Sequence, residues 1–311
     1  MTSHNMLLPK AHLGTDMDHM GKVVMSDAGK DQTAKAGVSL FRPGKPAPRH
    51  TVTLDQRTGH DIFAVPRALT TISPARVWDS LSPISLDATR LAGNGLFTQS
   101  SPNPAVTAFD MLRTRLLQAL SDRGWRRLAV TSPTHGCGKS FVAANLALSL
   151  ARLSATRTVL VDLELRRPHL ADIFGVKDVA PLAEFLSGDQ PLESHFRRFG
   201  PNLALGLNGA PVPDAATLLQ DPDTTAALDA MVAQLQPDAL IYDLPPALVS
   251  DDVVAMIPHI DAVLLVVDGT RSTAADIKAT ERLFDGKVPL MGVVLNKAQD
   301  RGLGRYAYGK R

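Results

Sequence analysis

The chain has 311 residues, which is enough for one large domain or two ordinary ones. Its 33 basic and 31 acidic side chains leave a formal net charge of +2, so composition gives no reason to expect nucleic acid or an anionic membrane as a partner. A single cysteine, Cys137, excludes an internal disulfide, and no apolar run is long enough to span a membrane. We therefore expect a soluble, cytoplasmic protein that would reach the inner face of the plasma membrane only through a partner.

Residues 1–72 show no sustained helical or strand periodicity, and Pro, Gly, Lys, Asp and His are scattered through them. A segment of this composition buries too little apolar surface to offset the entropy lost on ordering, so we expect a disordered N-terminal arm. Five of the nine histidines lie in this arm without the spacing of a metal site, and we interpret them as solvated loop residues: His4, His12, His19, His50 and His60.

The rest of the chain is expected to form one domain that begins with a leader over 73–103. Four apolar side chains among Pro and Ser could pin an extended leader onto the core: Trp78, Leu81, Ile84 and Leu86. Phe97 is expected to end a short strand. Asn103 as the cap and Pro104 at the first helical position then predict a helix that ends near Gly124.

The strongest motif lies over residues 127–151, which predict a strand, a tight glycine-containing loop and a helix rich in Ala and Leu. In this context Gly-Lys-Ser predicts a phosphate-binding loop. Backbone N–H groups and the helix N-terminus face the anion, Lys139 reaches the terminal phosphates, and Ser140 ligates Mg²⁺. The predicted nucleotide contacts are Thr134, His135, Gly136, Cys137, Gly138, Lys139, Ser140 and Phe141. Pro133 replaces the first glycine of the usual pattern G-x-x-x-x-G-K-[ST], and a chance Gly-Lys-Ser in a turn is the alternative interpretation.

Carboxylates end two further apolar strands. The strand over 157–165 carries Asp162 and Glu164, which alternation places on one side, at the edge where a parallel sheet binds its ligand. Both are candidates to hold Mg²⁺-bound water or to activate a hydroxyl; the alternative is that one caps the next helix or pairs with Arg166. The next strong strand ends in Asp243, which predicts a Walker-B-like carboxylate that holds Mg²⁺ through water.

A last strand over 291–296 ends in Asn296, whose amide is expected to contact the adenine edge. Tyr242, inside the strand that ends in Asp243, is interpreted as a core residue. The other predicted elements are helices over 170–174, 181–186, 214–219, 224–235 and 273–284 and strands over 203–207 and 260–267. Because strands alternate with helices from about 126 to 297, we predict an α/β fold, with a mostly parallel sheet flanked by helices on both faces and a mobile tail over 298–311.

These motifs resemble one family, the bacterial tyrosine autokinases (BY-kinases) of capsule and exopolysaccharide synthesis, which share a P-loop fold with the septum-positioning and chromosome-partitioning ATPases. The matching segments are Thr131–Ser140, Val161–Pro168, Asp243–Pro246 and Val294–Asn296. The positioning ATPases carry a second, signature lysine where this chain has Thr134, and that difference favours the kinase branch. The run Arg166-Arg167-Pro168 favours it as well.

The resemblance implies an autokinase that uses ATP and Mg²⁺ to phosphorylate, in trans between copies of the chain, tyrosines of the C-terminal tail. It assigns catalysis to Lys139, Asp162, Glu164 and Asp243, with Asp162 as our candidate base, and Mg²⁺ binding to Ser140, Asp162 and Asp243. The phosphate acceptors would be Tyr306 and Tyr308. It also implies a separate membrane-spanning chain-length regulator, or co-polymerase, as the activating partner, and a ring-shaped homo-oligomer; no nucleic acid is expected.

Three departures from the family pattern leave other functions open. Asp-x-Glu stands where the family has Asp-x-Asp, and the tyrosine cluster is reduced to two residues. The ring-assembly motif Glu-x-x-Arg-x-x-Arg falls on Thr107, Asp110 and Arg113, of which only the last is kept. The alternatives are a nucleotide-switched ATPase without kinase activity and an interaction protein that binds nucleotide without turnover.

Overall fold

The computed structural model describes residues 23–24, 73–100 and 103–298. The predicted disordered arm therefore lies outside the described residues except for Val23–Val24, whose backbone forms a short strand. The tail over 299–311, with both predicted acceptor tyrosines, also lies outside them. None of the helices in the described ranges combines the length and hydrophobicity that a membrane span requires.

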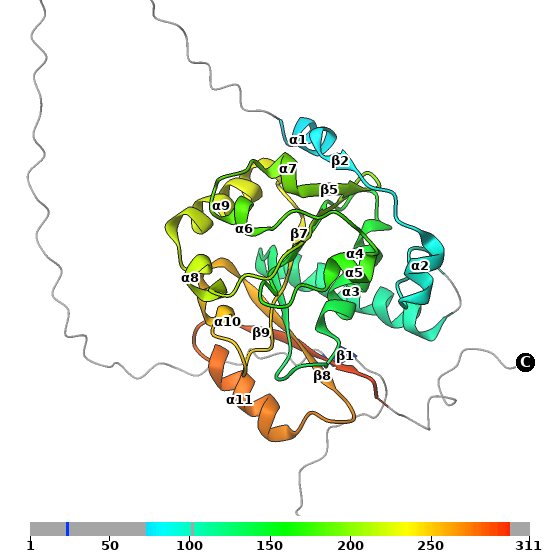
Figure 1. Cartoon of the computed structure of the whole chain (residues 1–311). Helices are drawn as coiled ribbons and strands as arrows, with labels where there is room; N and C mark the ends of the chain where they lie inside the picture. The colour runs from blue at the N-terminus through cyan, green and yellow to red at the C-terminus, as the bar shows by residue number, and fades with distance from the viewer. Residues whose placement is uncertain (1–22, 25–72, 101–102, 299–311) are drawn as a thin grey trace, which may run out of the picture.

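A nine-stranded sheet runs through the domain in the order β1-β9-β8-β3-β7-β4-β6-β5-β2 (Figure 1). Neighbouring strands in this sheet run parallel, except for the antiparallel pairs β1–β9 and β5–β6. The strands are β1 (Val23–Val24), β2 (Ser82–Pro83), β3 (Arg127–Thr131), β4 (Thr158–Asp162), β5 (Phe196–Phe199), β6 (Leu203–Gly206), β7 (Ala239–Asp243), β8 (Ala262–Asp268) and β9 (Leu290–Asn296). Because β7 lies between β3 and β4, the carboxyl ends of these three strands meet at one place on the sheet edge.

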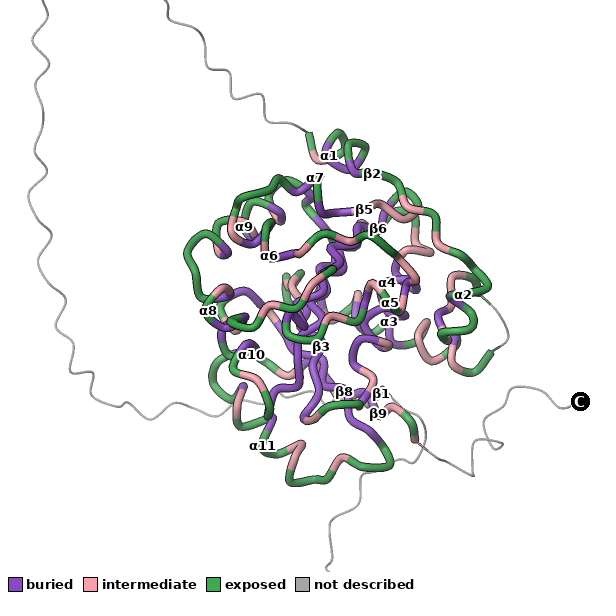
Figure 2. Tube along the Cα trace, viewed as in Figure 1, coloured by how far each residue is buried: buried purple, intermediate pink, exposed green. Residues whose placement is uncertain are grey.

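Helices cover both faces of the sheet, as predicted. They are α1 (Pro74–Ser80), α2 (Ala88–Gly93), α3 (Pro104–Arg123), α4 (Lys139–Ala151), α5 (Leu170–Phe174), α6 (Ala183–Leu186), α7 (Leu192–His195), α8 (Ala215–Leu219), α9 (Pro222–Leu235), α10 (Asp252–Ala255) and α11 (Ala274–Phe284). A 3₁₀ turn, Ile257–His259, precedes β8. In β3, Leu128 and Val130 pack in the core formed with α3, α4 and α5, whereas Ala129 between them packs in the core formed with α1, α6, α8, α9 and α11. Figure 2 shows the resulting buried strands at the centre of the domain.

The predicted elements from residue 103 onward are confirmed within a few residues of their expected bounds. The side chain of Asn103 caps α3 by accepting from Ala105 N at 2.9 Å, and Gly124 ends that helix in a left-handed conformation. Tyr242 is a core residue, as interpreted: its side chain is fully buried, and burial raises the pKa of its hydroxyl far above the usual value.

The leader is anchored as predicted, but the expectation of an extended backbone is wrong. Trp78 is 3% exposed, and its indole N–H donates to Leu235 O of α9 at 2.8 Å. The leader forms α1 and α2 because Pro74 stands at the first position of α1 and the Asp87 side chain caps α2. Phe97 ends no strand; its backbone N–H instead donates to the Asn145 side chain at 3.1 Å.

Candidate active site

The phosphate loop lies between β3 and α4, and its shape depends on two glycines. Gly136 and Gly138 have φ angles of 78° and 87°, a left-handed region that residues with a Cβ rarely adopt. A Cβ built on Gly138 would also collide with the amide nitrogen of Asn296. The N–H groups of the loop and of the first turn of α4 are the donors that an anion would meet. The strand, loop and helix predicted from the sequence are confirmed.

Acidic side chains surround the ammonium group of Lys139, the first residue of α4. Its Nζ donates to Glu164 Oε2 and, at 3.1 Å, to Ser140 Oγ, and it lies 3.7 Å from Asp243 Oδ1. The side chains of Lys139 and Glu164 are only 9% and 6% exposed, so solvent screens this ion pair little. The alternative that Glu164 pairs with Arg166 is wrong, because the Arg166 guanidinium instead bonds Asp252 of α10 at 3.0 Å.

Asp162 and Asp243 are neighbours in the register of β4 and β7, and both are fully buried. Burial raises the pKa of each carboxyl; the charge of Asp243 raises the pKa of Asp162 further, whereas Lys139 lowers both. Asp162 Oδ2 accepts from Leu170 N at 3.1 Å, so Asp162 also caps α5, as one of the sequence alternatives has it. Asp162 Oδ1 and both oxygens of Asp243 have no hydrogen-bond partner among the described residues.

The Ser140 hydroxyl lies close enough to the Asp243 carboxyl to lower its pKa, and Asp162 is the neighbour of Asp243 in the sheet. This donor set suits a hard divalent cation such as Mg²⁺. Within the described ranges, no group of three or more His, Cys, Asp or Glu side chains has the geometry of a complete metal site. Two carboxylates and one hydroxyl would leave the other positions around Mg²⁺ to water or phosphate oxygens, which is how this ion is usually bound. The positions match the predicted set of Ser140, Asp162 and Asp243, while their role as metal ligands stays a prediction.

Asn296, at the end of β9, contacts the phosphate loop directly. Its Nδ2 donates to Cys137 O at 2.9 Å, so this amide holds the loop in the structure. Contact of Asn296 with the adenine edge stays a prediction. Sequence reasoning missed three further residues that reach the loop or support it, namely Asp268, Arg271 and Lys297. The only signal for them was the position of Asp268 and Lys297 at the ends of two predicted strands.

The other predicted loop contacts differ in what they can offer a nucleotide. The His135 side chain is largely exposed. Its limited desolvation, and then the nearby cations Arg167 and Lys139, lower its pKa. Cys137 is buried, with its Sγ 3.3 Å from Thr134 O. The ring of Phe141 packs edge-on against Phe109 at 6.0 Å, so its backbone is the part that can meet a ligand.

The residues at the ring-assembly positions make contacts within their own chain. Arg113 donates to Ser149 O at 3.0 Å, and Asp110 Oδ1 accepts from Ser149 Oγ at 3.0 Å and pairs with Arg113 and Arg152. The hydroxyl of Thr107 donates to Asn103 O at 3.3 Å. The contacts of Asp110 and Arg113 tie α3 to α4, whereas that of Thr107 stays within the first turn of α3. A ring that used these side chains would have to break these contacts.

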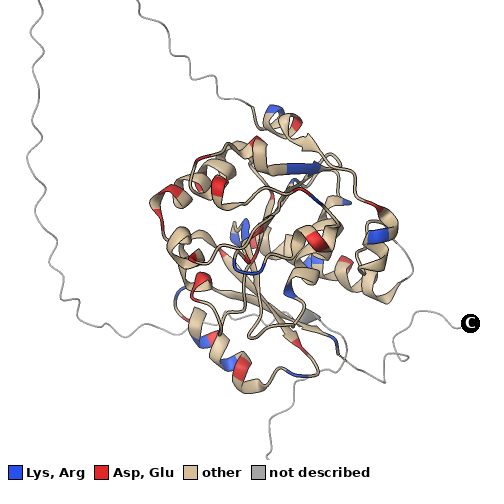
Figure 3. Ribbon diagram, viewed as in Figure 1, with Lys and Arg blue, Asp and Glu red and all other residues tan. Residues whose placement is uncertain are grey.

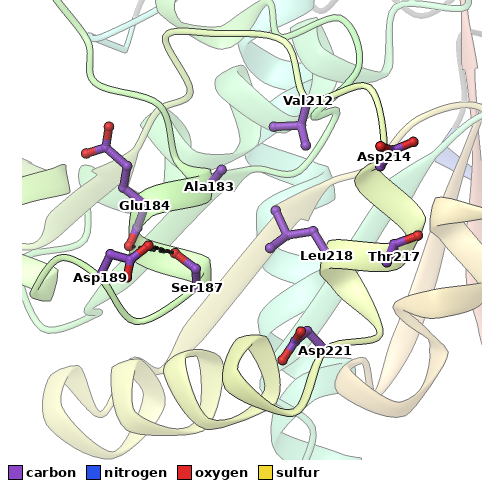
Figure 4. A pocket seen from close by; sticks show the side chains of 9 residues that line it. All are labelled: Ala183, Glu184, Ser187, Asp189, Val212, Asp214, Thr217, Leu218 and Asp221. Atoms are coloured by element: carbon purple, nitrogen blue, oxygen red, sulfur yellow. Dashed lines mark hydrogen bonds between the residues drawn. The ribbon is translucent and has the colours of Figure 1, made fainter.

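An open hollow of about 450 Å³ lies between α6, α8 and the start of α9 (Figure 4). Four carboxylates rim it, and three apolar side chains contribute to its lining. Its lining comprises Ala183, Glu184, Ser187, Asp189, Val212, Asp214, Thr217, Leu218 and Asp221. None of the predicted site residues lines this hollow, so it is separate from the phosphate loop. In Figure 3, which shows the whole domain, acidic and basic residues are interspersed, in keeping with the small net charge of the chain.

Comparison with known proteins gives relatives for this domain. EpsB of Ralstonia nicotianae, which is named as a tyrosine-protein kinase, is 34% identical over 240 residues, covering 74% of this chain and 31% of EpsB. The tyrosine-protein kinase Etk of Escherichia coli is 28% identical over 215 residues, covering 68% of this chain and 29% of Etk. The chain thus spans about a third of the length of the curated relatives it matches.

Solved structures agree with this placement. The kinase domain of Escherichia coli ETK is 29% identical, with a TM-score of 0.58, over 66% of this chain and 80% of that domain. The BceF tyrosine kinase domain is also 29% identical, with a TM-score of 0.55, over 62% of this chain and 78% of that one. A family model, ParA, described as a NUBPL iron-transfer P-loop NTPase, matches residues 123–300. The matched residues include β3, the phosphate loop and α4. The chain therefore belongs to the ParA family of P-loop NTPases, and its relatives within that fold include bacterial tyrosine kinases.

Proposed function

We propose that this chain is an ATP-dependent protein-tyrosine autokinase that acts in the synthesis and export of a capsule or exopolysaccharide. One observation carries the proposal: Lys139 of the phosphate loop pairs with Glu164, which follows β4, and with Asp243 at the end of β7, in a domain related to named tyrosine-protein kinases. The reaction forms a bond between a tyrosine oxygen and the γ-phosphorus of ATP and breaks the bond to the bridging oxygen, which leaves with ADP.

The residues take distinct parts in this proposal. Lys139 would leave Glu164 to bind the terminal phosphates and stabilise the charge of the transition state. Asp162 would accept the tyrosine proton, for which its raised pKa and its unpartnered Oδ1 suit it. Ser140 and Asp243 would hold Mg²⁺, which when bound neutralises charge on the phosphates. Tyr306 and Tyr308 are the proposed acceptors.

The proposal includes a membrane-spanning co-polymerase as the activating partner, which would bring the kinase to the inner face of the plasma membrane. It also includes a homo-oligomer, since a tail phosphorylated by another copy needs a second chain nearby. Apart from Val23–Val24, which pair with β9 of the sheet, the N-terminal arm, 1–72, would lie outside the catalytic domain, 73–311, because it shows no sequence periodicity.

Phosphotyrosine mapping by mass spectrometry tests the function. The protein is incubated with ATP and Mg²⁺, alone and with the cytoplasmic segment of a candidate partner, beside Lys139→Met and the double variant Tyr306→Phe/Tyr308→Phe. Phosphate on Tyr306 or Tyr308 that disappears in Lys139→Met is the expected result. ATP hydrolysis without phosphotyrosine, unchanged in the double tyrosine variant, would instead establish a nucleotide-switched ATPase. Nucleotide binding without hydrolysis would establish an interaction protein.

A further inference from the structure

Three successive carbonyl oxygens of the phosphate loop each accept a hydrogen bond from a side chain at the ends of β8 and β9. The donors are Arg271 Nη2 to His135 O at 3.4 Å, Lys297 Nζ to Gly136 O at 2.6 Å and Asn296 Nδ2 to Cys137 O at 2.9 Å. Two of the three donors are cations that the proposed reaction does not use. These contacts join segments 136 to 161 residues apart in the sequence.

Asp268, the last residue of β8, holds both cations in place. Its side chain is 1% exposed, and Oδ2 lies 3.2 Å from Arg271 Nε and 3.4 Å from Lys297 Nζ. Oδ1 accepts from the backbone N–H and the hydroxyl of Thr270, at 2.9 and 2.6 Å. The two Thr270 contacts, with Arg271 and Lys297, hold the pKa of Asp268 well below its usual range, so it is charged at neutral pH.

The backbone of Lys297, whose side chain donates to Gly136 O, has an uncommon conformation. Its φ angle is 57°, in the left-handed region that few residues other than glycine adopt. Such a conformation persists only where surrounding contacts hold it, and it is frequent at functional sites. Here the contacts are the ion pair with Asp268 and the hydrogen bond to Gly136 O.

Capping these carbonyls has a consequence for anion binding. A loop that alternates right- and left-handed residues can turn successive N–H groups into one concavity, and its carbonyls must then find partners elsewhere. Gly136 and Gly138 supply the left-handed positions, and the side chains from β8 and β9 supply the partners. If a carbonyl lost its partner, its peptide unit would be freer to rotate and the adjacent N–H would leave the concavity part of the time.

We propose that Arg271 and Lys297, held by Asp268, are positioning residues that keep the phosphate loop in its anion-binding conformation before a nucleotide arrives. This inference rests on the nucleotide site of the proposed function and not on kinase activity. The ligand class concerned is a nucleoside di- or triphosphate. Because both side chains are cations, their long-range attraction for phosphate is the effect that the experiment must separate from positioning.

The experiment measures two quantities on the full chain: the dissociation constant of a fluorescent ADP at low and high salt, and hydrogen exchange of peptide 134–140 without nucleotide. The variants are Arg271→Ala, Lys297→Ala and Lys297→Arg, all at side chains that are about half exposed or more, so folding should be kept. Lys278→Ala is the matched control, since Lys278 is an exposed cation on helix α11, which follows Arg271 in the chain, and the structure gives it no hydrogen bond or ion pair with the described residues of the loop.

Lys297→Ala is expected to weaken ADP binding about 5- to 10-fold, the usual effect of one lost hydrogen bond, and to speed exchange in the loop. Arg271→Ala, whose contact is longer, should have a smaller effect in the same direction, and Lys297→Arg should restore both quantities. Lys278→Ala should leave both unchanged. The weakening by Lys297→Ala should persist at high salt, because positioning is screened less than long-range attraction.

Unchanged exchange in Lys297→Ala would overturn the inference, as would an affinity loss that vanishes at high salt or is equalled in Lys278→Ala. Failure of the wild-type chain to bind ADP would overturn it as well. Wild-type protein that binds ADP but makes no phosphotyrosine would refute the proposed kinase and leave this inference standing.

Discussion

Replacement of Trp78 tests whether the leader is part of the folded domain. Trp78→Ala removes a side chain that is 3% exposed and is packed in the core shared with α9. Truncation of a buried Trp costs about 3 to 5 kcal/mol. The Leu235 carbonyl also loses its partner at 2.8 Å, which adds about 1 kcal/mol. We therefore expect Trp78→Ala to lower the free energy of unfolding by about 4 to 6 kcal/mol in urea denaturation followed by circular dichroism.

Trp78→Phe divides this cost into its parts, because it keeps most of the apolar volume and loses only the indole N–H. It should cost about 1 to 2 kcal/mol. Arg76→Ala, at an exposed position of the same helix, is the control and should stay within about 0.5 kcal/mol of the wild type. A loss below about 1 kcal/mol in Trp78→Ala would show that α1 can detach without cost to the domain, and the reasoning from burial would fail.

Three further predictions concern the site, the titration of a buried histidine and the N-terminal arm. Glu164→Gln removes one of the two carboxylates that pair with Lys139, so ADP should bind about 3- to 10-fold more tightly in EDTA, as measured by fluorescence titration. Equal or weaker binding would contradict the view that Glu164 competes with phosphate for Lys139. Burial lowers the pKa of His195, so the fold favours the neutral ring, and stability should be full above the unfolded pKa of about 6.5 and fall as the pH drops below it. In His195→Phe the urea midpoint should change less between pH 7 and pH 5 than it does in the wild type. The same change with pH in both proteins would assign that pH dependence to other groups. Deletion of residues 1–72 should leave ADP affinity within about 2-fold, and a larger loss would place part of the arm in the nucleotide site.

The sheet and the phosphate loop could be predicted because their signals are local. Apolar runs such as Leu128–Val130 identify buried strands, and Gly138 between a strand and a helix marks the loop, without knowledge of distant contacts. The short strand Phe196–Phe199 gave no comparable signal, because two of its four residues are arginines and its pairing is set by β6. The helices of the leader were missed because their caps at Ser73-Pro74 and Asp87 lie in a stretch of mixed composition.

The site could be predicted only as a set of residue types at strand ends. Topology brings Asp162 and Asp243 together, and the sequence indicated that much. Which partner each charge takes depends on geometry between distant segments: Lys139 selects Glu164, 25 residues away, and Arg166 selects Asp252, 86 residues away. The contacts of Arg271 with the phosphate loop depend in the same way on the fold and leave no local pattern.

The two outer strands of the sheet affect how the molecule meets other chains. Within the part of the chain that the structure describes, both edges are formed by two-residue strands, β1 beside β9 and β2 beside β5. A long exposed edge strand is a template on which a strand of another molecule can pair, and short edge strands are one of the ways in which proteins prevent this. One of these strands ends in Pro83, which has no N–H to donate. At high local concentration, we therefore expect copies of this domain to associate through helices and loops and not through growth of a shared sheet.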